Sequence, residues 1–152
     1  MRSIGAALSL GLAIASAYAT IGQAQAPAPP AAADAASAPI RLELNRLESD
    51  GDNCRAYLLI DNSKGTSHRS FKVDLFVLDT EGIAAKRVVL ELGPVAAKKT
   101  LIRLFDIQGV PCAKFGKVLL NDVLGCEDAA GQRQNCLANT TTDSKAAVPL
   151  VK

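Results

Sequence analysis

The stretch SFKVDLFVLD, residues 70–79, decides how the rest of the chain is interpreted. Successive residues of an extended backbone lie on opposite faces. One face of this stretch is then wholly apolar, with Phe71, Val73, Leu75 and Val77, and the other carries Lys72, Asp74, Phe76 and Leu78. Apolar residues on both faces indicate burial on both sides, so the pattern predicts a central strand rather than an edge strand.

Further strands are predicted on either side of this stretch by alternating apolar residues between polar turns. Asp79-Thr80-Glu81-Gly82 predicts a hairpin turn, because glycine accepts the positive φ that such turns need. Gly93-Pro94 ends the next strand, since proline cannot donate to a ladder. The predicted strands cover residues 40–45, 55–60, 83–92, 100–107 and 117–124, with weaker candidates at 137–142 and 146–151. Seven or eight short strands without a helical period predict an antiparallel β-sandwich.

Composition narrows the class of protein. A chain of 152 residues that is 49% hydrophobic can hold one domain with a core of ordinary size. Its net charge of +2 and isoelectric point near 8.4 lack the concentrated basicity of a nucleic-acid binder. Lys and Arg alternate with Asp and Glu through most of the chain, which is typical of a soluble surface.

Residues 1–19 have the features of a secretory signal peptide. Arg2 precedes an apolar run, and Ala17-Tyr18-Ala19 supplies a small-x-small cleavage pattern before Thr20; Ala24-Gln25-Ala26 is a second candidate, with cleavage after Ala26. The run is too short for a transmembrane anchor, and a single arginine precedes it, so we expect a Sec-type signal. These features predict a periplasmic or secreted protein.

Residues 20–39 are expected to be a disordered linker. Nine alanines and four prolines crowd these twenty residues with a single charge at Asp34, and such a segment has no apolar periodicity to bury. Composition changes at Ile40, where the folded domain, residues 40–152, is predicted to begin.

The four cysteines, Cys54, Cys112, Cys126 and Cys136, all follow the linker. An even number in an exported chain predicts two disulfides, and sequence alone leaves three pairings open. Cys126 and Cys136 flank a polar loop, which favours a local bridge there and leaves Cys54 with Cys112. A four-cysteine zinc site is disfavoured, because zinc ligands normally occur in closely spaced pairs.

The chain has one histidine, His68, which lies in a polar connection near Asp61 and Ser67. A loop histidine in such a setting is expected to be solvated rather than catalytic, and no catalytic, cofactor-binding or metal-binding residue is assigned. Asp50 and Asp52 are interpreted as turn residues, because the calcium pattern is incomplete.

Two further sets of polar residues have structural interpretations. Asp106 and the pair Asn121-Asp122 interrupt apolar runs, and we expect them to end ladders or to satisfy buried backbone groups. Lys86-Arg87 and Lys98-Lys99 are candidates for one small basic patch at a hairpin end.

Three stretches carry a resemblance to known domains: CRAYLLIDNS, FKVDLFVLDTEG and LELGPVAAKKTLIRL. They resemble the immunoglobulin-like domains of exported bacterial proteins, including the FxLYD type. From Ile40 onward, RLELNRLESDGDNCRAYLLIDN, LFDI and LLNDVLGC are similar to a family of small uncharacterised exported proteins of alphaproteobacteria. Some members of that family have twin-arginine signals, which this chain lacks. The resemblance implies an immunoglobulin-like fold and an exported location, and no cofactor or activity.

The functional expectation is a non-enzymatic exported module that binds an envelope protein or a cell-wall component, through an open strand edge or a loop. One alternative is a small hydrolase or metal-binding protein with a site around His68. Another is a purely structural or stress-related envelope protein.

Overall fold

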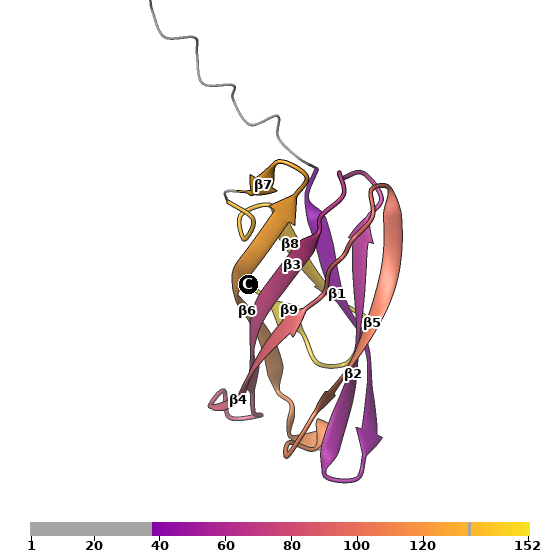
Figure 1. Cartoon of the computed structure of the whole chain (residues 1–152). Coiled ribbons are helices and arrows are strands. Elements are labelled where there is room, and N and C mark those ends of the chain that lie inside the picture. Colours follow the sequence, from indigo (N-terminus) through magenta and orange to yellow (C-terminus); the bar gives the residue numbers. More distant parts are fainter. Residues whose placement is uncertain (1–37, 134) are drawn as a thin grey trace, which may run out of the picture. The chain divides into compact units, whose positions relative to one another are not determined.

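Strands make up most of the regular structure in residues 38–133 and 135–152, which the computed structural model describes (Figure 1). The predicted signal peptide and almost all of the predicted linker lie outside these residues and stay predictions. The first strand begins at Ile40, the residue at which composition changes. In chain order the elements are β1 (Ile40–Asp50), β2 (Asn53–Asn62), β3 (Ser70–Leu78), β4 (Ala84–Glu91), β5 (Lys99–Ile107), the 3-10 helix η1 (Cys112–Lys114), β6 (Lys117–Asp128), β7 (Gly131–Gln132), β8 (Thr140–Ser144) and β9 (Leu150–Val151).

Two sheets pack face to face and confirm the predicted β-sandwich. One sheet has the strand order β5-β2-β1-β8, and the other has the order β4-β3-β6-β7 with β9 added beside β6. Side chains from the inner faces of both sheets form one core. Its fully buried members include Leu42, Leu44, Leu58, Ile60, Phe71, Val73, Val77, Leu92, Val95 and Leu120.

The stretch from which the prediction started forms β3, which lies between β4 and β6 and is therefore a central strand, as predicted. Phe71, Val73, Leu75 and Val77 are all buried on its inner face. On its outer face only Asp74 is fully buried, while Lys72 is exposed and the last two residues are half-buried. The turn at Asp79 to Gly82 connects β3 to β4 as expected, with Gly82 at φ +85° and the Asp79 carboxylate accepting from the amides of Glu81 and Ile83.

The sandwich is less uniformly antiparallel than predicted. β8 lies parallel to β1, and β9 lies parallel to β6. After β7 the chain crosses to the first sheet, forms β8, and returns to the second sheet as β9. Both strands run in the same direction as the neighbour with which they pair. Nine strands are present among the described residues rather than seven or eight, because the polar loop after β6 contributes the short β7. No helix in this part of the chain is long and apolar enough to cross a membrane.

Two disulfides join Cys54 to Cys112 and Cys126 to Cys136, the pairing that the sequence favoured. The first closes a loop with a sequence separation of 58 residues and fastens η1 to β2. The second has a separation of 10 and fastens the loop after β7 to β6. A disulfide of either kind restricts the unfolded chain, which contributes about 2–4 kcal/mol in the loop-entropy account. Disulfides persist in oxidising compartments, so the pair indicates a location outside the cytoplasm.

Candidate functional site

β5 is one of the two edge strands of its sheet, and β8 is the other. It pairs with β2 over nine residues without a bulge, and among the described residues no strand pairs with its other edge. Figure 1 shows β5 at the rim of the molecule, with its length open on the side away from β2. A strand of this length is about 30 Å long at roughly 3.4 Å per residue. Along that length, backbone N–H and C=O groups are available to an added strand.

The outer face of this edge is apolar. Ile102 and Leu104 are 46% and 53% exposed, and they lie opposite Leu59 and Tyr57 of β2, which are half-buried. These four residues are called the β5 patch. A single exposed apolar side chain is ordinary on a protein surface, whereas a group of them beside an unpaired strand edge is a candidate interaction site.

Polar pairs border the β5 patch at both ends of β5. At one end Arg55 Nε donates to Asp106 Oδ1 over 2.6 Å, between residues that face each other in the ladder. At the other end the Thr100 hydroxyl donates to Asp61 Oδ1 over 3.1 Å. Hydrogen bonds from Ser63 lower the pKa of Asp61 to about 2, so this carboxylate is ionised at neutral pH. The apolar surface thus ends in a fixed charge on each side.

The third border holds the Tyr57 ring in place. The Arg46 guanidinium lies 4.2 Å from the ring centroid, and the Tyr57 hydroxyl donates to Glu48 Oε2 over 2.8 Å. Arg46 Nη2 also donates to Glu48 Oε2. Both the ring face and the hydroxyl are therefore engaged, which leaves the rest of the ring as a rigid wall of the patch.

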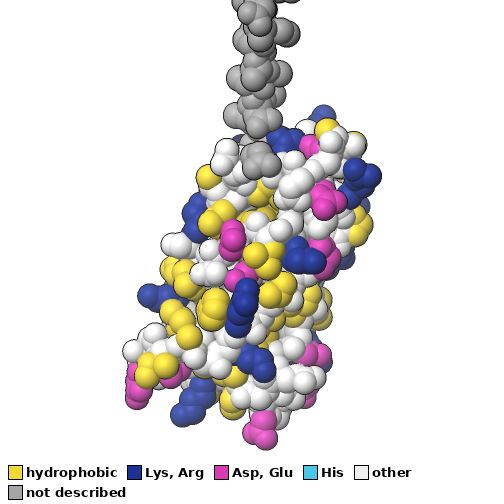
Figure 2. Space-filling model, turned by 60° about the vertical axis from the view of Figure 1, so that its left-hand side comes forward, with side chains coloured by type: hydrophobic (Ala, Val, Ile, Leu, Met, Phe, Trp, Pro, Cys, Tyr) yellow, Lys and Arg dark blue, Asp and Glu magenta, His cyan; other side chains and the backbone are white. Residues whose placement is uncertain are grey.

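β4, an edge strand of the other sheet, has a different outer face. Val89 is 48% exposed there, but Asp74, which lies opposite it in the ladder, is buried and forms an ion pair with Arg87. Arg87 Nε and Nη2 donate to the two oxygens of Asp74 over 2.7 and 3.2 Å, and Asn121 Nδ2 donates over 2.8 Å. The hydrogen bonds from Arg87 lower the pKa of Asp74. Figure 2, which looks at the side carrying β6, β3 and β4, shows hydrophobic side chains in separate groups with charged side chains between them.

A bulge in β6 makes this arrangement possible. The β3–β6 register shifts between Asp74 and Leu75, which leaves Asn121 as the extra residue of β6. Bulges re-aim side chains, and here the bulged residue reaches Asp74. We predicted that Asn121 and Asp122 end ladders or satisfy buried backbone groups. Both lie inside β6, so neither ends a ladder. Asp122 accepts from the part-buried amide of Val123, whereas Asn121 binds the Asp74 side chain, so the prediction is wrong for Asn121.

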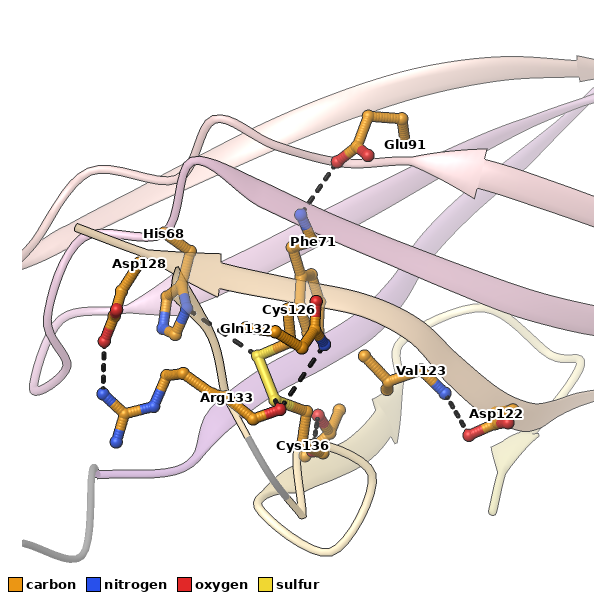
Figure 3. Close-up of a disulfide and its surroundings, with 11 residues drawn as sticks. His68, Phe71, Glu91, Asp122, Val123, Cys126, Asp128, Gln132, Arg133 and Cys136 are labelled. Carbon is orange, nitrogen blue, oxygen red and sulfur yellow. Dashed lines mark hydrogen bonds and ion pairs between the residues drawn. A yellow bond between two sulfur atoms is a disulfide. The ribbon is translucent and has the colours of Figure 1, made fainter. Parts of the chain in front are cut away.

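His68 is not the solvated loop residue that the sequence predicted, because it is only 4% exposed (Figure 3). Its backbone forms an isolated bridge with Val95, with both hydrogen bonds at 2.8 Å. This bridge draws the ring under the surface, where Nδ1 lies 3.8 Å from Cys126 Sγ of the second disulfide. Burial lowers the pKa of His68, so the ring is neutral at neutral pH.

The surroundings of His68 give little basis for catalysis. The nearby Asp128 carboxylate is held by Arg133 Nη1 at 2.6 Å, and the cysteine sulfur is in a disulfide. The hollow beside the ring has a volume of about 20 Å³, which is the size of a single water site. In residues 38–133 and 135–152 no group of three or more His, Cys, Asp or Glu residues could hold a metal ion.

Two other predictions are corrected by the structure. Asp106 does not satisfy a buried backbone group, because its side chain is half exposed and pairs with Arg55. Lys86-Arg87 and Lys98-Lys99 do not share a hairpin end: Lys86 pairs in register with Val77 at one end of β3, while Lys99 pairs with Asn62 in the other sheet. Asp50 and Asp52 lie at the β1–β2 turn, as interpreted, with Asp50 Oδ2 3.6 Å from Arg55 Nη2.

The β5 patch was missed in the sequence. The run Lys99–Ile107 has apolar residues at consecutive positions, Leu101-Ile102 and Leu104-Phe105, so both of its faces are apolar. That pattern was available, but in a central strand it indicates burial on both sides, and only the strand order places β5 at an edge.

Comparison of the chain with protein-family models, curated proteins and solved structures finds no match.

Proposed function

We propose that this protein is a non-enzymatic exported binding module that receives an extended segment of a protein partner along the open edge of β5. The observation that carries the proposal is the unpaired, bulge-free edge of nine residues beside the β5 patch. In this mode of recognition, main-chain hydrogen bonds supply affinity and alternate side chains supply specificity.

The side chains of β5 suit this mode. On the outer face an added strand covers Ile102 and Leu104, whose exposed area is the main apolar gain on binding. The Arg55–Asp106 pair and the Asp61–Thr100 pair lie at the two ends and can select the register through charge. Natural edges are usually protected by bulges, prolines or inward-pointing charges. β5 contains no proline, and its register has no bulge. Its middle does carry an inward-facing charge, Arg103, which is bound to the Leu92 and Pro94 carbonyl oxygens of its own chain.

The two disulfides are the basis for the compartment. Within that setting we propose a periplasmic or secreted protein, exported by the Sec-type signal of residues 1–19, whose partner is an envelope protein. Kinship with the FxLYD-type immunoglobulin-like domains belongs to the same proposal. Mass spectrometry of the exported protein should give a mature chain that begins after Ala19 or Ala26, and a full-length chain would contradict the export proposal.

Site-specific photocrosslinking tests the binding surface. A photoreactive residue placed at Leu104 should capture a partner in envelope extract, whereas the same residue at Val89 should not. Val89 is a matched control because it is 48% exposed, against 53% for Leu104, and also lies on an edge strand. Equal capture at both positions, or capture at neither, would contradict binding at β5.

A further inference from the structure

We infer that the strand received by β5 is the β5 strand of a second copy, paired antiparallel about a two-fold axis at Arg103. The inference rests on the proposed function and names the partner for the same edge. Such a pair joins two four-stranded sheets into one continuous sheet and satisfies both open edges at once. The reason for choosing a second copy is that the β5 sequence is complementary to itself in this register.

The outer face gives the first match. With Arg103 opposite Arg103 of the second copy, Ile102 of one copy faces Leu104 of the other, and the reciprocal pair forms on the other side of the axis. Leu59 and Tyr57 flank Ile102 and Leu104 within each copy. The two β5 patches therefore merge into two apolar rows, each running from Leu59 through Ile102 of one copy to Leu104 and Tyr57 of the other.

The inner face and the strand ends match in the same register. Leu101 faces Phe105 of the second copy, and both side chains are half-buried in the single chain, so pairing completes their burial. Thr100 faces Asp106 of the second copy, which places an uncharged side chain opposite each carboxylate. No position puts two carboxylates opposite each other.

The axis itself carries a cost. Two Arg103 side chains face each other there, and like charges directly opposite destabilise a pair of strands. Each guanidinium also lies within hydrogen-bonding distance of the Leu92 and Pro94 carbonyl oxygens of its own chain, at 3.4 and 3.5 Å, which anchors it toward the β4–β5 connection. The surface area that one strand edge buries is also smaller than the roughly 1,600 Å² of a standard interface. We therefore expect a weak, concentration-dependent dimer.

Sedimentation analysis of single and mixed variants tests both the partner and the register. Ile102→Lys and Leu104→Glu should each lower self-association at least about tenfold, because each places a charge opposite an apolar side chain in both halves of the pair. An equimolar mixture of the two variants should form a heterodimer. In the inferred register the introduced lysine faces the introduced glutamate, while Leu104 of one copy faces Ile102 of the other. A register shifted by two residues brings no such pair together.

Val89→Lys on β4 is the matched control and should associate like the unmodified protein. Circular dichroism and the intact masses of the disulfide-bonded chains show whether each variant is folded. If the unmodified protein dimerises but the equimolar mixture of Ile102→Lys and Leu104→Glu forms no heterodimer, the inferred register is wrong. A monomer over the whole range from about 1 µM to about 1 mM would overturn self-pairing, and the proposed function would then still stand if photocrosslinking at Leu104 captured another protein. Failure of both experiments would reject the β5 edge as a binding surface.

Discussion

Two of the edge strands, β5 and β4, have similar lengths and similar exposed apolar residues but opposite surroundings. On the β4 side, a buried Asp74 held by Arg87 and Asn121 places fixed charge in the middle of the outer face. On the β5 side, the middle of the outer face is apolar and the charges lie at the ends of the strand. The two faces therefore differ in where charge lies along the strand, and the proposed function depends on this difference.

The largest effect on folding is expected at Asp74 of β3, which pairs with Val89 of β4. Asp74→Ala removes the acceptor of three side-chain hydrogen bonds and leaves Arg87 and Asn121 without it. Loss of a buried hydrogen-bonded partner should lower the free energy of unfolding by about 1–3 kcal/mol. Urea denaturation measures this value. An unchanged midpoint and slope would show that the β4 face does not depend on its buried carboxylate.

Acid should weaken the border of the β5 patch that Asp61 and Thr100 form, and the low pKa of Asp61 gives the direction of the effect. The pKa of Asp61 is about 2 in the folded protein, against 3.8 for an ordinary aspartate side chain, so the unfolded chain binds this proton at a higher pH than the folded chain does. The stabilisation is complete above about pH 4 and is lost as the pH falls toward about 2.

Urea denaturation at a series of pH values checks this direction. Asp61→Asn should flatten the decline in stability between these pH values, with the unmodified protein as reference. Equal slopes in the two proteins would contradict an anchored Asp61 beside the β5 patch.

A matched pair of polar substitutions should separate the two edges by surface behaviour rather than by stability. Leu104→Thr and Val89→Thr both alter exposed side chains, so each should change the free energy of unfolding by no more than about 0.5 kcal/mol. Only Leu104→Thr should raise the ammonium sulfate concentration needed for precipitation, because it interrupts a contiguous apolar patch. The same shift for both variants would remove the distinction between the faces.

The smallest effect is expected at the end of β5. Asp106→Ala breaks the ion pair with Arg55. The side chains of both residues are solvent-accessible. Surface ion pairs contribute little to folding. We expect no resolvable change in urea denaturation, in contrast to Asp74→Ala. A loss as large as that of Asp74→Ala would mean that the charges bordering β5 are structural too.

Much of the fold followed from local patterns. The alternation from Phe71 to Val77 predicted a buried central strand, and the turn ending at Gly82 predicted its hairpin partner. His68 was misjudged, because a polar loop in the sequence gives no sign that a backbone bridge to Val95 draws the ring beneath the surface. Asn121 was misjudged because a bulge in β6 cannot be recognised from the residues of β6 alone.

By itself the sequence determined the positions of most strands and that four cysteines form two bridges, since these follow from periodicity and number. Only the tertiary structure decided which strands lie at the edges. Leu101-Ile102 and Leu104-Phe105 have the same apolar character wherever β5 is placed. Whether Ile102 and Leu104 are buried or exposed depends on the strand order, which is set by contacts between residues far apart in the chain.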